Sequence, residues 1–351
     1  MMGRLSAGAG HTCAVEPGGG VACWGSNPDG QLGDGGELDA PLPKPLDGLR
    51  GIRAVAAGSY HTCALATAGA VFCWGWNVGG QVGDGLIANR LSPFEVPGLT
   101  NIAALAMGSY HSCALLGDGG ERCWGQNDYG QLGNGAQQNS GTPVGVFSLP
   151  PSTAVAAGGR HSCARLADAT VQCWGGNDVG ELGDGTTMAH SFPEPVTGVG
   201  DASEVAAGFN HSCALRAGGG VTCWGANGYG QLGDGTTTDS PLPVAVVGLE
   251  GAVAIATGYN HSCAVLAGGE ARCWGWNDAG QLGDGTKIGR ATPSAVTGLA
   301  QVTAIAGGGF HTCAATAGGA VWCWGSNDSG QLGDPSATEH LAPAMVGGVG
   351  L

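Results

Sequence analysis

Short apolar stretches recur along the chain, and within them apolar side chains share faces in a way that predicts β-strands. In the first unit, the strand that begins at His11 and the strand that ends at Trp24 flank a turn around Gly18. One side of this predicted hairpin carries His11, Cys13, Val15, Val21 and Cys23, and the other carries Ala14, Ala22 and Trp24. Because both sides are apolar, we expect the hairpin to lie between two neighbouring sheets.

The same pattern returns every 50 residues through the whole chain. It is marked by His11, His61, His111, His161, His211, His261 and His311. Each unit predicts four short strands separated by glycine-rich turns, which is typical of a propeller blade. An open stack of coils would need unlike terminal units, whereas these seven are nearly interchangeable. We therefore predict an all-β fold, a single seven-bladed β-propeller over residues 1–351 with four-stranded antiparallel blades.

The length of the chain predicts how the ring closes. Seven periods of 50 residues account for 350 of the 351 residues, so the chain is one whole turn of a ring cut inside a repeat. We expect Arg4–Gly8 to form the strand that Ala54–Gly58 forms in the next unit. The preceding strand of the same blade is expected at Ala344–Gly348, so that the N- and C-terminal strands join in one blade and leave no free sheet edge.

The composition agrees with an all-β chain and narrows the range of partners. There are 71 glycines, and only 11% of the residues are charged. No stretch reaches about 18 consecutive apolar residues, so no membrane span is expected. The net charge of -15 would repel nucleic acid, and no basic cluster offsets it.

The 14 cysteines form seven pairs whose members stand ten residues apart. Counting outward from the turn places the members of a pair opposite each other, close enough for a disulfide. The predicted bridges are Cys13–Cys23, Cys63–Cys73, Cys113–Cys123, Cys163–Cys173, Cys213–Cys223, Cys263–Cys273 and Cys313–Cys323. An even set without a leftover cysteine favours an oxidising compartment. The alternative is seven pairs of reduced, buried cysteines in a cytoplasmic protein.

No metal, cofactor or catalytic set is predicted. A site of His11, Cys13 and Cys23 would offer three ligands where structural zinc takes four. The loop Asn127–Gly135 is only partly similar to a calcium loop, because the terminal glutamate is absent. The histidines and cysteines recur in seven equivalent copies, which indicates an architectural role rather than a nucleophile and its base. Trp24 and its six counterparts are expected in the core, over alanines of adjacent blades.

Two repeated motifs resemble the regulator of chromosome condensation repeat family. They are Gly-x-x-His-Thr/Ser-Cys-Ala and Trp-Gly-x-Asn-x-x-Gly-Gln-Leu-Gly-Asp-Gly, and they span all seven units. The resemblance implies a seven-bladed propeller, and the paired cysteines are most similar to those of cysteine-rich bacterial members. The family includes exchange factors for a small nuclear GTPase, a plant UV-B photoreceptor and a secreted inhibitor of β-lactamases. The resemblance alone therefore selects no function.

The sequence departs from these specialised branches. The exchange factors use an inserted wedge and basic chromatin-binding elements, but here the period admits no insertion and the charge is negative. The photoreceptor carries clustered Trp and Arg in the two positions before the histidine. The matching pairs here include Gly159/Arg160, Phe209/Asn210 and Tyr259/Asn260, without Trp. The inhibitor branch offers no signature that can be transferred residue by residue.

Positions that vary between the units are candidates for a binding site, because positions shared by all units serve the blade. The residues just before each histidine vary but are rich in aromatic side chains, and they are Tyr60, Tyr110, Arg160, Phe209, Tyr259 and Phe310. They should ring one face of the propeller, and aromatic residues and arginine are enriched in interface hot spots. A second set after Trp-Gly is Trp76 and Trp276, and a third after Asp-Gly includes Ile87, Asn89, Arg90, Gln137, Met188, His190 and Phe192. The alternative for the first two sets is that they only cover blade ends.

We expect a non-catalytic, monomeric scaffold that binds a protein partner through one ring face. A carbohydrate-binding propeller is the alternative, since aromatic rings stack on sugars and repeated blades give multivalency. An enzyme inhibitor, a UV-B photoreceptor and a GTPase exchange factor are less favoured. The cysteine pairing predicts extracellular or periplasmic placement, and cytoplasmic placement if the cysteines are reduced. Met1–Gly10 carries no signal peptide, so export is expected to need a signal that precedes it.

Overall fold

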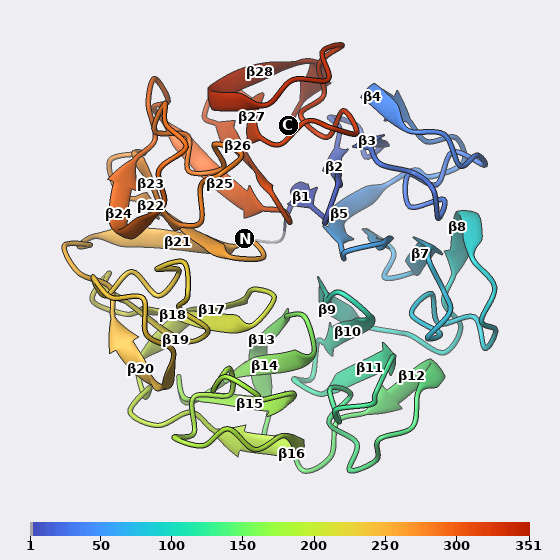
Figure 1. Cartoon of the computed structure of the whole chain (residues 1–351). Coiled ribbons are helices and arrows are strands. Elements are labelled where there is room, and N and C mark those ends of the chain that lie inside the picture. The colour runs from blue at the N-terminus through green and yellow to red at the C-terminus, as the bar shows by residue number, and fades with distance from the viewer. Residues whose placement is uncertain (1–2) are drawn as a thin grey trace.

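The computed structural model describes residues 3–351 and forms a ring of seven four-stranded antiparallel sheets (Figure 1). The predicted seven-bladed propeller is confirmed, and within residues 3–351 the regular structure consists of strands without a helix. Those residues accordingly contain no helix able to cross a membrane. Met1 and Met2, which the predicted domain included, lie outside the described residues.

Each blade consists of four strands that follow one another in sequence. The first four blades are formed by β1 (Leu5–Ala7), β2 (His11–Val15), β3 (Val21–Gly25) and β4 (Ala40–Pro45); β5 (Ile52–Ala57), β6 (His61–Ala66), β7 (Val71–Gly75) and β8 (Arg90–Glu95); β9 (Ile102–Met107), β10 (His111–Leu116), β11 (Glu121–Gly125) and β12 (Ser140–Gly145); and β13 (Ser152–Ala157), β14 (His161–Leu166), β15 (Val171–Gly175) and β16 (His190–Pro195). The last three are formed by β17 (Ala202–Ala207), β18 (His211–Arg216), β19 (Val221–Gly225) and β20 (Ser240–Ala245); β21 (Ala252–Thr257), β22 (His261–Leu266), β23 (Ala271–Gly275) and β24 (Arg290–Ala295); and β25 (Val302–Gly307), β26 (His311–Thr316), β27 (Ala320–Gly325) and β28 (His340–Gly350).

The central hairpin of each blade has the register that the alternating pattern predicts. In the first blade Cys13 lies opposite Cys23, and Val15 lies opposite Val21. The paired cysteines are 4.0–4.1 Å apart at their Cα atoms and are joined in all seven blades, which confirms the predicted bridges. The outer strand Ala40–Pro45 contains three prolines. Proline is tolerated there because an edge strand pairs on one side only.

The core lies between the blades rather than inside them. Trp74 of the second blade is fully buried and shares a cluster with the disulfide Cys13–Cys23 and with Leu32 of the first blade. The expectation that the tryptophans are core residues is therefore correct. Their clusters contain the disulfide of the neighbouring blade. The clusters of Trp24 and Trp324, for example, also contain an alanine of that blade, Ala315 or Ala271. Gly33 makes room for the indole, since a Cβ at this position (φ +76°) would lie 2.6 Å from Trp74 Nε1. A glycine is required there because of both the positive φ and the closeness of the indole.

A chain of buried hydrogen bonds connects each blade to the next. His11 Nε2 lies 2.9 Å from Thr62 Oγ1, and that hydroxyl donates to the backbone oxygen of Gln31 at 2.8 Å. Trp74 Nε1 donates to the same oxygen at 2.9 Å. Since the hydroxyl has one proton and gives it to Gln31, the imidazole must be the donor in the first bond. The histidine motif is thus an architectural joint between blades, as its seven copies indicate.

The Gly-x-x-His motif has a steric cause in these joints. A Cβ on Gly58 would lie 2.5 Å from Cε1 of His61 and 2.5 Å from the backbone oxygen of Gly108 in the next blade. Both distances are shorter than any real Cβ contact, so a side chain at this position would push the histidine or the neighbouring blade away. The glycine and the histidine therefore occur together in every unit.

The predicted ring closure is correct in one part and wrong in another. The strand β1 occupies the predicted place of Arg4–Gly8, at the inner edge of its blade next to the centre of the ring (Figure 1). The segment Ala344–Gly348 lies in β28, however, which pairs with β27 in the seventh blade and not with the blade of β1. The first and last strands do not join in one blade. The reason is that the chain is cut at a link between blades, which the period alone could not distinguish from a cut within a blade.

The seam between the seventh and first blades is closed by the same contacts as the other interfaces. His311 Nε2 lies 2.8 Å from Thr12 Oγ1, which donates to the backbone oxygen of Gln331 at 3.0 Å. Trp24 Nε1 also donates to that oxygen at 3.0 Å. Leu5 and Trp24 share a hydrophobic cluster with the seventh blade. Seven equivalent interfaces therefore complete the ring without a shared sheet.

Candidate interaction face

The two faces of the ring are built from different chain segments. Because neighbouring strands are antiparallel, the β1–β2 turn (residues 8–10) and the β3–β4 loop (residues 26–39) lie at one end of the blade. We call this the upper face. The β2–β3 turn (residues 16–20) and the link to the next blade (residues 46–51) form the lower face. All eight candidate residues of the first two predicted sets belong to upper-face segments.

The central channel meets the upper face at a mouth that side chains fill. The mouth is lined by the last residues of the inner strands and by the turns that follow them, and it encloses about 90 Å³. Phe209 and Tyr259 project into it, and Tyr259 Oη donates to Ser59 Oγ at 2.7 Å, a bond between the sixth and second blades. Burial raises the pKa of Tyr259, and the nearby Tyr60 and Tyr110 raise it further. Tyr259 therefore links opposite sides of the ring as a neutral phenol.

One aromatic cluster lies on the second and third blades. The ring of Trp76 meets Tyr60 at a centroid distance of 6.0 Å and Tyr110 at 5.6 Å, both edge to face. The two tyrosine rings are 6.3 Å apart. The backbone brings these segments together, since Trp76 N donates to the Tyr60 oxygen at 2.9 Å. All three side chains stay partly exposed.

A second aromatic cluster lies on the fifth, sixth and seventh blades. Tyr259 is 4.8 Å from Phe209 and 5.5 Å from Phe310, measured between ring centroids. Trp276 meets Phe310 at 5.1 Å and Tyr229 at 5.5 Å. Through Tyr259 the second cluster reaches the side of the mouth where the first cluster begins. Together they form an aromatic band across the upper face.

Arg160 of the fourth blade stands beside this band. Its guanidinium carbon lies 4.7 Å from the centre of the Tyr129 ring, and Nη1 donates to Tyr129 Oη at 2.9 Å. Arg160 also acts on Tyr110, whose pKa is raised by burial and by Tyr60 but lowered by this positive charge. The arginine is therefore stacked and hydrogen bonded to one neighbour while remaining exposed.

Two aromatic residues of the upper face were not among the residues predicted from the sequence. The structure also divides the first predicted set into two groups. Tyr129 and Tyr229 stand at a position where the other blades carry Asp, Gly, Val, Ala or Ser, so variation between units could have identified them. Phe209 and Tyr259 stand two residues before the histidine, and they fill the channel mouth. Tyr60, Tyr110, Arg160 and Phe310 stand one residue before it. This difference of one position therefore decides whether a side chain lies in the channel mouth or around it.

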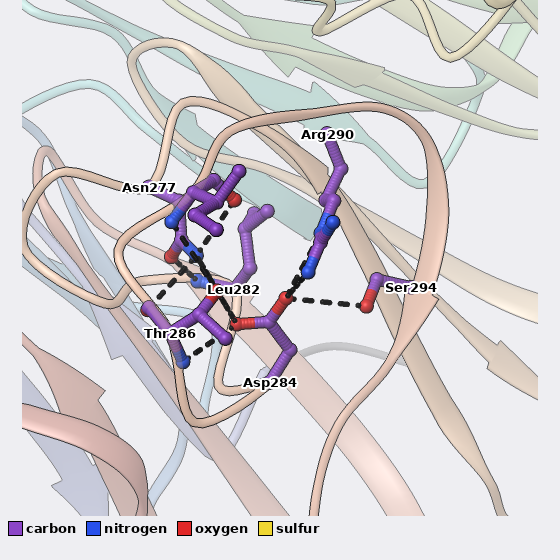
Figure 2. Close-up of polar contacts among 7 residues, drawn as sticks. Asn277, Leu282, Asp284, Thr286, Arg290 and Ser294 are labelled. Atoms are coloured by element: carbon purple, nitrogen blue, oxygen red, sulfur yellow. Dashed lines mark hydrogen bonds and ion pairs between the residues drawn. The ribbon is translucent and has the colours of Figure 1, made fainter.

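The long loop before the outer strand of each blade has its polar groups hydrogen bonded within the blade, as Figure 2 shows for the loop between β23 and β24. Asn277 Oδ1 accepts from Leu282 N at 2.9 Å, and Nδ2 donates to Thr286 O at 3.0 Å. Asp284 accepts from Thr286 N at 2.9 Å and from Arg290 Nε at 3.1 Å. Burial alone would raise the pKa of Asp284, but these hydrogen bonds outweigh it and lower the pKa. The loop thus holds its carboxylate with donors from the protein, which explains the motif without calcium.

The third predicted set is largely explained by these loops. Arg90 pairs with Asp84 at 2.6 Å, and His190 pairs with Asp184 at 3.2 Å. Phe192 meets Phe147 at 5.4 Å between ring centroids, and both rings are exposed away from the aromatic band. The other members are Ile87, Asn89, Gln137 and Met188 on the variable loop segments, where Ile87 and Met188 are exposed and Asn89 donates to Asp29.

Sequence profiles of known families match the chain along its whole length. One profile of the regulator of chromosome condensation (RCC1) repeat matches residues 18–65, 68–115, 123–165, 168–215, 218–265, 269–315 and 318–349. A second RCC1 profile matches residues 4–31, 52–81, 102–131, 153–181, 202–231, 252–281 and 302–331. The chain belongs to the RCC1 repeat family. No curated protein matches it in sequence.

Solved structures of other proteins have a similar fold. The crystal structure of Kap60 bound to yeast RCC1 (Prp20) aligns with a TM-score of 0.83 at 22% identity, over 98% of this chain and 85% of that chain. Human WBSCR16 aligns with a TM-score of 0.84 at 25% identity, over 93% and 94%. The CRINKLY WD40 ectodomain of the Arabidopsis thaliana receptor kinase ACR4 aligns at 0.59 and 20% identity, over 96% and 98%.

The repeats of the first profile are out of phase with the blades, whereas those of the second each cover the first three strands of one blade. The repeat at residues 18–65 contains β3 and β4 of the first blade and β5 and β6 of the second. Cys63 therefore ends one RCC1 repeat, and its partner Cys73 lies in the next. Six of the seven bridges thus connect consecutive repeats of the first profile, because Cys13 precedes its first matched repeat. In the second profile both cysteines of every bridge lie within one repeat.

Proposed function

We propose that this RCC1 repeat propeller is a non-catalytic scaffold that binds a protein partner outside the cytoplasm through its upper face. The observation that carries the proposal is the aromatic band, in which side chains from five blades converge around the channel mouth. Other blades carry non-aromatic residues at the equivalent positions, such as Gly10, Asn210 and Ser26, so the fold does not require aromatic rings there. Partly exposed aromatic rings and a stacked arginine are the residues that dominate protein interfaces.

Proteins with a similar fold support the binding of a protein partner, and the disulfide bridges support placement outside the cytoplasm. Yeast Prp20, which has this fold, is described as bound to Kap60 and as binding Gsp1p and histones. The similar domain of ACR4 is described as an ectodomain. Seven disulfide bridges are consistent with an oxidising compartment. A surface formed by a rigid ring suits binding without rearrangement of the scaffold.

The chain itself supplies the variants for a test. Trp76→Ser and Trp276→Ser together remove two rings of the band, and Ser26 and Ser326 show that serine fits this position. The matched control is Phe147→Thr with Phe192→Thr, which removes two exposed rings at the outer rim. Threonine occupies both of these positions in other blades.

The three proteins are immobilised at equal density and exposed to secreted and periplasmic proteins of the organism that carries the gene. Proteins captured by the wild type are then produced separately and titrated. We expect at least one to bind the wild type and the rim control alike, and to bind the tryptophan variant at least about tenfold more weakly, since hot-spot residues contribute about 2 kcal/mol each. Equal binding to all three proteins would overturn the proposal. Binding only on a glycan array, lost in the tryptophan variant, would establish the carbohydrate alternative instead.

A further inference from the structure

We infer that the partner presents a cationic segment, with arginine or lysine side chains, to the upper face. This inference rests on the proposed function and adds the chemistry of the partner. It comes from the charges around the aromatic band, which are not needed to explain the fold.

Exposed carboxylates surround the band. They occupy the fourth position after the conserved Trp in four blades, and they are Asp128, Asp178, Asp278 and Asp328. The equivalent residues elsewhere are Pro28, Val78 and Gly228, so the blade does not require an acid there. Unlike several of the loop aspartates, none of the four takes part in the salt bridges formed within residues 3–351.

The carboxylates lie next to the aromatic residues. Asp128 accepts from Gln126 Nε2 at 2.7 Å, and Gln126 N donates to the backbone oxygen of Tyr110. Asp328 accepts from Ser326 Oγ at 3.2 Å, and the Ser326 backbone is bonded in the same way to Phe310. A group that rests on the band is therefore within reach of negative charge on both sides of the channel mouth.

The upper-face segments contain little positive charge to oppose a cation. Their lysines and arginines are Arg160 and Lys287. Arg160 is stacked on Tyr129, and Lys287 pairs with Glu339 in the outer loops. The net charge of -15 adds a long-range attraction for a positively charged partner.

The protein already shows how this surface holds a cation. Arg160 places its guanidinium over the Tyr129 ring at 4.7 Å and donates a hydrogen bond to its hydroxyl. Aromatic faces attract cations through their quadrupole, and nearby carboxylates strengthen that attraction. Trp76 and Trp276 offer further indole faces of this kind, which are the best aromatic partners for a cation. The band and its carboxylates together therefore match an arginine- or lysine-bearing segment better than a neutral or acidic one.

The test neutralises the carboxylates without changing their shape. The upper-face variant carries Asp128→Asn, Asp178→Asn, Asp278→Asn and Asp328→Asn. Its matched control carries Asp47→Asn, Glu95→Gln, Glu250→Gln and Glu270→Gln at exposed positions toward the lower face. Both variants change the net charge by four, from -15 to -11. The two variants therefore lose the same amount of charge at different positions. A thermal melt of each variant checks that it is folded.

The probes are fluorescein-labelled peptides Gly-Arg-Gly-Arg-Gly-Arg-Gly and its glutamate counterpart. We expect the arginine peptide to bind the wild type and the lower-face control, and to bind the upper-face variant at least about tenfold more weakly, while the glutamate peptide does not bind. Equal binding of both peptides, equal binding of the arginine peptide to both variants, or no binding of it to the wild type would each overturn the inference.

The captured protein partner separates the two proposals. If its binding is lost in the tryptophan variant but unchanged in the upper-face Asn variant, the scaffold function stands and the cationic partner is wrong. If the tryptophan variant also binds it normally, both fail. Weakening by both variants, with a steeper loss at high salt for the wild type than for the Asn variant, supports both.

Discussion

Glu121 is a buried acid at a position that is apolar in the other six blades. Its equivalents are Val21, Val71, Val171, Val221, Ala271 and Val321. It is 5% exposed, and Oε1 accepts from Ser152 Oγ at 2.6 Å across the interface to the next blade. Oε2 has no hydrogen-bond partner among residues 3–351. Burial raises the pKa of Glu121 to about 8.

We predict that replacing this polar pair stabilises the protein. Glu121→Val with Ser152→Ile copies Val21 and Ile52, which pack together in the first interface. Removing a buried, half-satisfied carboxyl should raise the free energy of unfolding by about 1–3 kcal/mol near neutral pH. Because the folded pKa of Glu121 lies above its unfolded value, its contribution is retained below about pH 4.5 and lost as the pH rises through 8.

The measurement is the denaturant midpoint of wild type and double variant at pH 5 and pH 9. The advantage of the variant should be larger at pH 9. An advantage that does not change with pH would show that Glu121 is not protonated in the folded protein. Glu121→Gln with Ser152 retained serves as the control, since it keeps the shape and removes the titration.

The central hairpin of each blade carries its disulfide bridge inside an interface with a neighbouring blade. The cysteines are at most 1% exposed. In the third interface Cys113 Sγ lies 3.9 Å from Ser162 Oγ of the next blade, so the neighbouring sheet covers the bridge. A reductant can reach the sulfur atoms only when adjacent blades separate.

We predict that the folded protein resists reduction. In millimolar dithiothreitol and iodoacetamide at pH 7, the intact mass should stay unchanged for hours, whereas in 6 M guanidinium all 14 cysteines should be alkylated. Removing one bridge as Cys213→Ala with Cys223→Ala should cost about 2–3 kcal/mol, because the closed loop is short. Rapid alkylation of the folded wild type would contradict this account.

The elements were largely predictable because their causes are local. Alternation placed Cys13 opposite Cys23, and the repeat indicated an architectural role for His61 and a core position for Trp74. The strand order at the ring closure was not predictable, since a period of 50 residues carries no information on where the blade boundary falls. The residues that meet across an interface could not be predicted either. Pairing Glu121 with Ser152, or Trp74 with a disulfide, requires knowing how two neighbouring blades are shifted relative to each other. At the site, variation between units identified eight residues, but a difference of one position, as between Phe209 and Tyr60, decided which fill the channel mouth.

The seven histidine joints make the stability of the whole ring depend on pH. Each histidine of the joints is fully buried and neutral, and burial lowers its pKa to about 3 or 4. Its unfolded pKa is near 6.5. Between these values the unfolded chain binds protons that the folded ring cannot bind, so stability is full above pH 6.5 and is lost as the pH falls.

We predict a steep, cooperative loss of stability between pH 6.5 and pH 4. Each histidine lowers the free energy of unfolding by up to about 1.4 kcal/mol per unit of decreasing pH in this window. Glu121 has the opposite pH dependence, but it can offset the effect of only one of the seven histidines. Thermal melts followed by circular dichroism at half-unit steps from pH 8 to pH 4 measure the effect. A melting temperature that stays constant down to pH 4.5 would show that the joints accept protons without breaking.

The upper-face positions of each blade lie outside the joints that hold the ring. Serine, tryptophan, glutamine, glycine and alanine alternate at the position of Trp76 while the buried contacts beneath it remain the same. Mutation can therefore alter one sector of the surface while the other six keep their chemistry. This modularity makes the ring highly evolvable: new recognition can arise by successive sector-by-sector changes, and libraries randomised at these positions should retain the folded scaffold.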